Sequence, residues 1–444
     1  MLNVRLGSVN NRLILHTREY CKWHSIVYIL KKVFFCHLWH LKDKVQAFDF
    51  RCVFNALQGR SVRFNGGTRL AEVGMKIRDI KADHFRIPLP AVLSDSVHGA
   101  MPAFELVTVS IRTDSGVEGV GYTYTVGHGG SSIRALIEYD LATILVGADS
   151  RCIERIWNQM WWLVHWVGRG GIAAFAISAI DIALWDIKGK AAGEPLWRLL
   201  GGTRSKGIMA YAGGVDLFFS PEELRLQTES FLERGFRAIK VKVGSESIVR
   251  DIERVRLVRD IVGDNFIVMA DANMRWSVDE AVRACNALRD FGLHWLEEPT
   301  VPDDIEGHAR IAALGKVPIA TGENMHTLFE FQRMIKFGGV SFPEPDVCNI
   351  GGVTAWMKVA HVAEANHLPI TSHGAHDLHV HLLTAVSNAS LMEVHGFGLE
   401  RFIKEPLKFK NGEAISPERP GHGVEVLWER LGRYRVNYGA EPRP

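Results

Sequence analysis

From residue 208 onward, short apolar segments alternate with amphipathic segments. Helical candidates such as 221–234 and 278–291 separate eight candidate strands, which lie at 208–214, 238–244, 266–274, 294–299, 318–324, 342–350, 368–374 and 390–396. Strands that alternate with helices form parallel sheets, and eight such units close into a barrel. We therefore predict an α/β fold in which residues 206–399 form a (β/α)7β TIM-like barrel, the catalytic domain. An open doubly wound sheet is the alternative, but no Gly-rich phosphate-binding loop follows a strand.

Residues 75–205 show a different order of elements. Two long strand-like stretches, a turn at 114–116 and the strand-like GVGYTYT (119–125) precede helical segments that include 172–190. This order predicts an N-terminal α+β capping domain. The irregular C-terminal segment, 400–444, is expected to pack on it.

The formal net charge of +2 is the sum of a basic first part and an acidic second part of the chain. Residues 1–74 hold 12 Lys/Arg and 4 Asp/Glu, a net of +8, whereas the other 370 residues hold 40 and 46, a net of −6. The most apolar run of this leader, 25–41, is interrupted by Lys31 and Lys32, so it is a poor membrane-spanning candidate. The leader is either a basic targeting segment or arm, or a stretch that precedes a true start at Met75.

Charge and cysteine usage narrow the class of protein further. An acidic main part argues against a nucleic-acid partner, and no apolar run indicates a membrane protein. The six cysteines form no CxxC pair, so a reducing compartment, the cytoplasm, is expected.

One charged or ionisable residue falls late in each of seven successive strands. The steps between neighbours are 20 to 29 residues, one strand–helix unit each, and the residues are Lys242, Asp271, Glu297, Glu323, Asp346, His373 and Glu393. Because the carboxyl ends of barrel strands meet at one mouth, we expect these side chains to form one cluster.

Three of these residues, Asp271, Glu297 and Glu323, are carboxylates on adjacent strands. They would repel one another unless a cation neutralised them, and ligands that offer only oxygen suit a hard ion such as Mg²⁺. The alternative is that these acids cap the helices that follow them.

The basic residues of the pattern suggest proton transfer. Lys240 and Lys242 share one strand face, which we expect to point into the barrel, where a nearby cation and a second lysine would lower a lysine pKa. Asp346 on the neighbouring strand would orient His373 and raise its basicity. His376, His379 and His381 lack this spacing and are interpreted as helix or loop residues.

These residues stand in motifs that resemble the mandelate racemase branch of the enolase superfamily. The motifs occur in order over residues 75 to about 430 and are KVK (240–242), DAN (271–273), WLEEP (295–299), GEN (322–324), PDVCNIGG (345–352), TSH (371–373) and LMEVHG (391–396). The resemblance implies Mg²⁺ on Asp271, Glu297 and Glu323. It also implies that Lys242 and His373 are the two acid/base groups, that Asp346 orients His373, and that Lys240 and Glu393 contact the substrate carboxylate.

The implied chemistry is removal of the proton α to a carboxylate, which gives an enediolate. Loops 91–104 and 122–132 of the capping domain are expected to close over the mouth with hydrogen-bonding groups that suit a polyhydroxylated acid. Further candidate substrate contacts are Asn273 of the DAN motif and, outside the motifs, His98, Tyr124 and Arg169.

The leading hypothesis is a sugar-acid dehydratase, a lyase. Phrases such as SDSVHG (94–99) and GYTYT (121–125) also resemble 3,6-anhydro-galactonate cycloisomerases, so an isomerase is the alternative, and a racemase or epimerase could use the same two bases. The expected partner is a small sugar-acid carboxylate, and the resemblance suggests a homo-oligomer.

Overall fold

The computed structural model describes residues 6–9, 12–15, 75–203, 207–395 and 397–439. The chain divides into two compact units, residues 1–72 and 73–444. In the first unit, β1 (Leu6–Val9) pairs with β2 (Arg12–Leu15) in an antiparallel hairpin. The rest of the leader lies outside the described residues, so both interpretations of it stay predictions.

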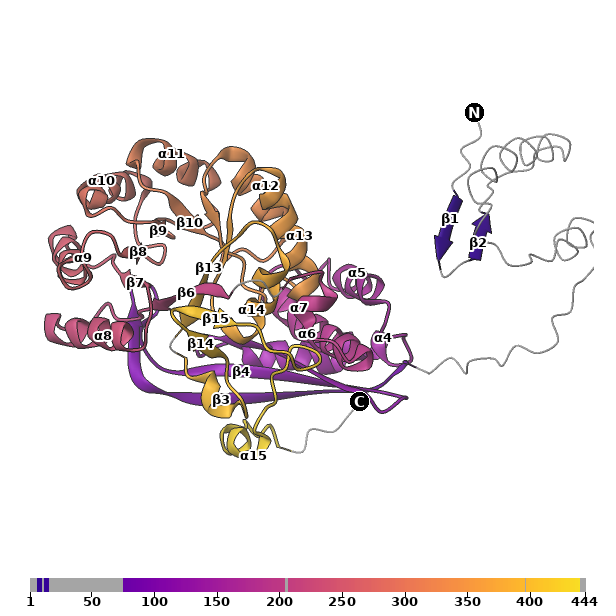
Figure 1. The fold of residues 1–444 in the computed structure, drawn as a ribbon. Helices are drawn as coiled ribbons and strands as arrows, with labels where there is room; N and C mark the ends of the chain where they lie inside the picture. Colours follow the sequence, from indigo (N-terminus) through magenta and orange to yellow (C-terminus); the bar gives the residue numbers. More distant parts are fainter. Residues whose placement is uncertain (1–5, 10–11, 16–74, 204–206, 396, 440–444) are drawn as a thin grey trace, which may run out of the picture. The chain divides into compact units, whose positions relative to one another are not determined.

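The second unit contains the predicted barrel (Figure 1). Its eight strands are β6 (Ile208–Gly213), β7 (Ala238–Lys242), β8 (Ile267–Asp271), β9 (Leu296–Glu297), β10 (Ile319–Thr321), β11 (Phe342–Pro343), β12 (Ile370–Ser372) and β13 (Ala389–His395). They follow one another around the sheet in the order β11-β10-β9-β8-β7-β6-β13-β12, and each paired neighbour is parallel. The (β/α)7β barrel is thereby confirmed.

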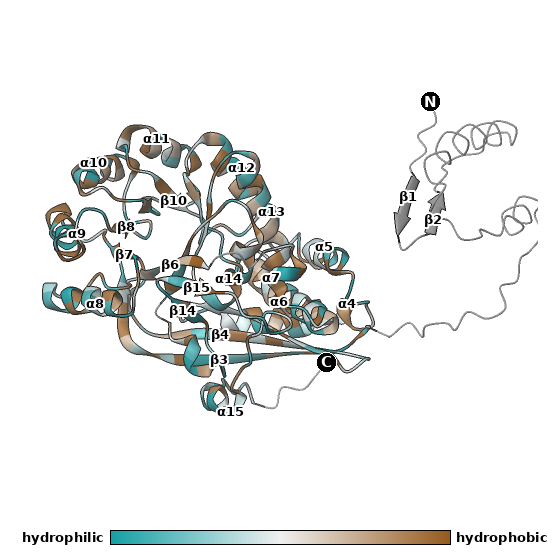
Figure 2. Ribbon diagram, in the orientation of Figure 1, coloured by the Kyte–Doolittle hydropathy of each residue, from teal (hydrophilic) through white to brown (hydrophobic). Residues whose placement is uncertain are grey.

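Seven helices connect these strands and surround the sheet (Figure 1). They are α8 (Pro221–Glu233), α9 (Ile248–Val262), α10 (Val278–Leu288), α11 (Ile305–Gly315), α12 (Leu328–Phe337), α13 (Gly352–Ala365) and α14 (His376–Ala385). Apolar and polar stretches alternate along the outer helices, as amphipathic elements require (Figure 2).

Strand β7 shows why the barrel can hold charge in its interior. All five of its residues are buried. Ile239 and Val241 belong to the apolar core that the strands share with the surrounding helices. Because side chains alternate along a strand, Lys240 and Lys242 face the other way, into the barrel.

The chain before the barrel forms a three-stranded antiparallel sheet, β3 (Ile77–Asp95), β4 (Gly99–Thr113) and β5 (Glu118–Thr125). It is followed by a π-helical turn, Leu136–Leu141, and the helices α3 (Gly130–Ala135), α4 (Ala142–Leu145), α5 (Ile153–Leu163), α6 (Ile172–Ala192) and α7 (Leu196–Leu199). The expectation that 91–104 is a loop was wrong, because paired strands continue to Asp95 and resume at Gly99. The capping segment is therefore the tip of a long hairpin.

The C-terminal segment contacts both the capping sheet and the barrel. It contains a 3-10 turn (Leu399–Phe402), β14 (Lys408–Lys410), β15 (Glu413–Ile415), α15 (Trp428–Leu431) and a second 3-10 turn (Gly432–Tyr434). β15 pairs with β6, and Arg435 forms an ion pair of 2.8 Å with Asp83 on β3. In the described residues, no helix combines the length and the apolar character that crossing a membrane needs.

Two glycines of β5 allow the capping sheet to lie directly on α6. A Cβ added to Gly121 would lie 2.0 Å from the carbonyl oxygen of Ala179, and one added to Gly119 would lie 2.2 Å from that of Ala183. Backbone atoms of a helix cannot move aside individually, so any side chain at these positions must separate β5 from α6.

We predict that Gly121→Ala lowers the free energy of unfolding by about 1–3 kcal/mol, the typical cost of overpacking a core. Gly432→Ala is the matched control, because a Cβ there meets nothing within 4 Å. Denaturant unfolding checks both variants. Equal stability of the two would contradict this account of the β5–α6 contact.

Candidate active site

The acids at the strand ends are not helix caps. Helices α10, α11 and α12 are capped by the side chains of Ser277, Asp304 and Thr327, each of which accepts a hydrogen bond from a first-turn N–H. Asp271 and Glu297 end β8 and β9, and Glu323 follows β10 by two residues. The capping alternative therefore does not explain them.

The three carboxylates converge on one point. Each of Asp271, Glu297 and Glu323 offers an oxygen that lies within 4.8 Å of the oxygens of the other two. Burial raises the pKa of Glu297, and the charges of Asp271 and Glu323 raise it further, against the opposing charge of Lys240. Oε2 of Glu323 is buried without a hydrogen-bond partner among the described residues. A cluster of buried oxygens with an unused lone pair fits a hard cation such as Mg²⁺.

Both lysines of β7 reach this cluster. Lys240 Nζ lies 2.5 Å from Glu297 Oε1 and 2.8 Å from Glu393 Oε1, and Lys242 Nζ contacts Asp271. Burial lowers the pKa of Lys242, but the charges of Asp271, Glu323 and Glu297 outweigh burial and the Lys240 charge, so its pKa lies above the ordinary value. The expected lowering of a lysine pKa assumed a cation bound to the acids, so it stays a prediction; without that cation, the acids act on the lysines directly.

Glu393, on β13, belongs to the lysine side of the cluster. Besides Lys240, it accepts a hydrogen bond of 2.8 Å from the backbone N–H of Gly374. Burial opposes ionisation of Glu393, but the charges of Lys240 and His373 hold its pKa well below the ordinary value. In this structure Glu393 holds Lys240, and its expected contact with a substrate carboxylate stays a prediction.

His373 lies at the other end of the row of acids. Its Nδ1 is 3.0 Å from Asp346 Oδ2, and its Nε2 is 3.3 Å from Glu323 Oε2. Burial lowers the pKa of His373, but the charges of Glu323, Glu393 and Asp346 raise it well above the ordinary value. The ring is thus oriented by one carboxylate while its second nitrogen faces the acid cluster.

Tyr124, a candidate substrate contact, supports this pair. It lies on β5 of the capping sheet, its hydroxyl donates a hydrogen bond to Asp346, and its oxygen is 3.4 Å from Nδ1 of His373. Its ring packs edge-on against Phe397. The hydroxyl is therefore used within the protein, which makes Tyr124 a positioning residue.

The tip of the β3–β4 hairpin is fixed to the loop after β8. Ser96 Oγ donates a hydrogen bond of 2.7 Å to the carbonyl of Ala272. Asp95 accepts a hydrogen bond of 2.8 Å from Nδ1 of His98, which raises the pKa of His98. Asn273, in the same loop, has a buried Oδ1 without a partner among the described residues. His98 and Asn273 thus remain candidate substrate contacts at the mouth.

Arg169 is not brought to the acids. Its guanidinium lies over the Trp161 ring, 5.5 Å from the centroid. It lines a cavity of about 340 Å³ together with Trp157, Trp162 and His326, and none of the clustered acids lines that cavity. The expectation that Arg169 contacts the substrate carboxylate is not supported.

Other polar residues near the barrel have structural partners. Glu298 accepts hydrogen bonds of 2.9 and 3.0 Å from Asn324 and offers no oxygen to the three-acid group. His379, on α14, is hydrogen bonded to the backbone of Val347 and Gly374. The sequence interpretation missed Glu344, a fully buried acid that accepts a 3.0 Å hydrogen bond from Tyr211. It also missed His395, which shares a strand face with Glu393.

Comparison with known proteins agrees with this geometry. The chain matches the mandelate racemase/muconate lactonizing enzyme N-terminal domain over residues 80–201 and the enolase C-terminal domain-like family over residues 223–430. The chain therefore belongs to the mandelate racemase group of the enolase superfamily.

Two related enzymes and one solved structure are similar to this chain. It is 51% identical to a 3,6-anhydro-alpha-L-galactonate cycloisomerase of Streptomyces coelicolor, over 81% of this chain and 99% of that protein. It is 34% identical to an L-talarate/galactarate dehydratase of Salmonella typhimurium, over 82% and 92%. A racemase structure from Streptomyces coelicolor with bound magnesium has a TM-score of 0.79 at 50% identity, over 81% of this chain and 100% of that one.

The contrast between Tyr124 and Tyr122 gives a testable prediction. Tyr124→Phe removes a hydrogen bond to an ionised buried carboxylate, so we expect a loss of about 1.5–3 kcal/mol in the free energy of unfolding. Tyr122 lies on the same strand, but its hydroxyl is buried without a partner among the described residues. Tyr122→Phe should leave stability unchanged or raised, measured by urea denaturation. A loss of similar size in both variants would contradict the assigned role of Tyr124.

Proposed function

We propose that the protein removes the proton α to the carboxylate of a sugar acid and then eliminates an oxygen from the β carbon. One observation carries the proposal: Lys242 and His373 stand at the two ends of a row of three carboxylates. Lys242 contacts Asp271 at one end, and His373 faces Glu323 at the other. A substrate held over the row would present its α carbon to a proton-transfer group on each face.

The same row would hold Mg²⁺ through Asp271, Glu297 and Glu323. Support comes from the oxygen-only donor set and from Oε2 of Glu323, which accepts no hydrogen bond from the described residues and faces only Nε2 of His373, 3.3 Å away. An L-talarate dehydratase of Polaromonas, 32% identical, has been solved with Mg and L-glucarate. When bound, Mg²⁺ would supply positive charge that holds the substrate carboxylate and offsets the acids around the lysines.

The side chains then act on a fixed α carbon. Either Lys242 or His373 takes the α-proton, and the electron pair of that C–H bond moves into the enediolate. Lys240, held by Glu297 and Glu393, stabilises the negative charge that gathers on the carboxylate oxygens. Asp346 and Tyr124 fix the ring of His373 throughout.

Collapse of the enediolate breaks the bond between the β carbon and its oxygen. The electron pair leaves with the oxygen, which receives a proton from the group on the opposite or the same face. The enol that remains converts to a 2-keto acid. Loss of a hydroxyl releases water, which is the dehydratase reaction of a lyase.

A second candidate uses the same bond cleavage. If the leaving oxygen belongs to an anhydro ring, it stays attached to the product, and the reaction is an isomerisation. The 51% identity to a 3,6-anhydro-alpha-L-galactonate cycloisomerase favours this substrate class specifically. A racemase would stop at the enediolate and return the proton.

We also propose a reducing, cytoplasmic location and a homo-oligomeric state. Cys152, Cys285 and Cys348 are free thiols. This agrees with a reducing compartment.

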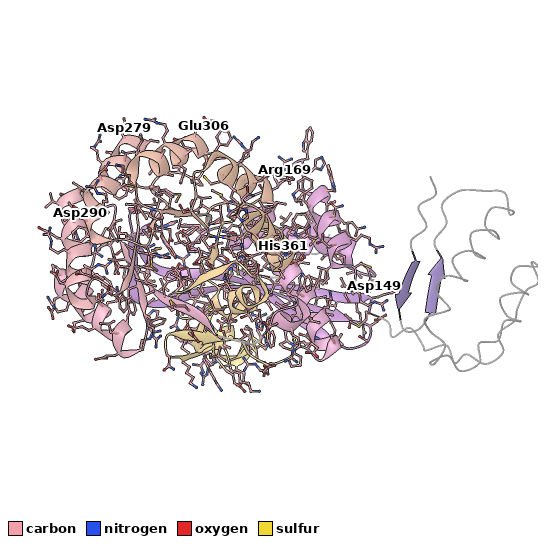
Figure 3. All side chains as sticks on the ribbon, turned by 45° about the horizontal axis from the view of Figure 1, so that its top comes forward. Asp149, Arg169, Asp279, Asp290, Glu306 and His361 are labelled. Carbon is pink, nitrogen blue, oxygen red and sulfur yellow. The ribbon has the colours of Figure 1, made fainter. Side chains whose placement is uncertain are left out.

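The test is turnover of aldonic, aldaric and 3,6-anhydro-sugar acids with Mg²⁺, with products identified by mass. We expect a 2-keto product, lost on chelation of the metal and restored by Mg²⁺. Lys242→Ala and His373→Asn should each lower kcat by at least about 10²-fold, the scale of one acid/base group. Glu306→Gln on α11, at the surface, is the control (Figure 3). Turnover retained in both active-site variants would contradict the two-base proposal.

A further inference from the structure

His395 lies next to the proposed acid/base groups but has no part in the mechanism above. It is the last residue of β13, two residues beyond Glu393, so the two side chains share the strand face that looks into the barrel. A strand rises about 3.3 Å per residue. His395 therefore begins about 7 Å nearer the mouth than Glu393.

The ring of His395 is held in a fixed position beside His373. A ring nitrogen of His395, one of His373 and a carboxylate oxygen of Glu393 all lie within 4.8 Å of one another. The two imidazoles meet edge-on with centroids 5.4 Å apart, and Phe397 meets the His395 ring edge-on at 3.9 Å. Packing thus fixes the direction in which the ring nitrogens point.

These nitrogens have no hydrogen-bond partner in the part of the chain that the structure describes. Burial lowers the pKa of His395 to about 3, and the charges of Lys240 and Lys242 act in the same direction while Glu393 opposes them. The imidazole is therefore neutral, with one N–H to donate and one nitrogen to accept. A polar group this close to an acid/base pair is expected to find a partner in a ligand.

His395 lines a cavity of about 300 Å³ with Leu93 of the capping hairpin, Gly213, Gln227 and Arg234. The clustered acids, the two lysines and His373 do not line this cavity, so the place of His395 at the site rests on the nearness of its ring to His373 and Glu393. Gly213 pairs with His395 in the sheet register. Because Gly213 has no side chain, the Glu393 carboxylate lies close to its backbone, with Oε1 2.6 Å from the position that a Cβ would take.

The height of His395 in the barrel indicates which substrate atom it meets. Lys240 and Glu393 mark the level of the substrate carboxylate, and Lys242 and His373 flank the α carbon. Atoms on the next carbon of the chain therefore lie nearer the mouth, at the level of His395. On a sugar acid, that carbon carries an oxygen.

We infer that His395 donates a hydrogen bond to the oxygen that leaves from the β carbon of the substrate. The inference rests on the proposed function and assigns a specific contact within it. The N–H of His395 stabilises the negative charge that develops on this oxygen as the C–O bond breaks, and it keeps its own proton. The proton that the oxygen acquires comes from His373 or Lys242, and the electron pair of the C–O bond goes to the oxygen.

The test separates α-proton exchange from elimination. Substrate is incubated in D2O with the wild-type protein, His395→Phe and His395→Asn, each with Mg²⁺. Deuterium in recovered substrate and the amount of 2-keto product are measured by NMR. We expect His395→Phe to lower elimination by about 10²–10³-fold, the scale of one lost donor, while exchange changes less than about threefold. His395→Asn, which retains a donor, should recover part of the elimination rate.

The matched control is His361→Asn, an exposed histidine on α13 (Figure 3). It should leave both rates unchanged. Equal loss of exchange and elimination in both His395 variants, or no loss in either, would overturn the inference. Failure of the proposed function looks different, because the wild-type protein would then show neither exchange nor product with any acid tested.

Discussion

The barrel depends on mutual neutralisation of charges buried at the carboxyl ends of its strands. Isolated charges are too costly to bury, and removing one partner of a buried pair is strongly destabilising. Here Lys240 lies between Glu297 and Glu393, and Lys242 contacts Asp271. The lysines and the acids therefore hold one another in a barrel that could not bury either set alone. The same balance leaves Oε2 of Glu323 without a hydrogen bond from the described residues, where a cation fits.

The capping sheet also contacts the charged cluster at the strand ends of the barrel. Ser96 attaches the hairpin tip to the loop after β8, and Tyr124 reaches from β5 to Asp346. The glycines of β5 bring the sheet onto α6, and α6 is joined to the barrel where Asp181 accepts hydrogen bonds from Thr354. Orientation of His373 thus depends on residues far from it in the sequence.

The spacing of the polar residues was sufficient to predict the barrel and to bring most of the site together. These residues recur once per strand–helix unit, and each lies late in its strand, so all of them end at the mouth of the barrel. Asp271, Glu297 and Glu323 could therefore be grouped without a structure. Hairpin geometry was harder to predict. Segment 91–104 contains Pro102 and small polar residues that indicate a loop, yet cross-strand pairing extends β3 to Asp95. Side-chain direction was harder still, since only the fold shows that Tyr124 faces Asp346 and that Arg169 lies on Trp161. The position of His395, two residues after Glu393, was a signal available in the sequence.

Binding of Mg²⁺ to metal-free protein, measured by titration calorimetry, tests the central claim most directly. The account predicts one ion per chain, with affinity at least about tenfold weaker in Glu323→Gln. Glu298→Gln is the matched control, because Glu298 faces Asn324 instead of the three-acid cluster, and it should bind as the wild-type protein does. Unchanged affinity in Glu323→Gln, or equal losses in the two variants, would contradict the claim that these strand ends form the metal centre.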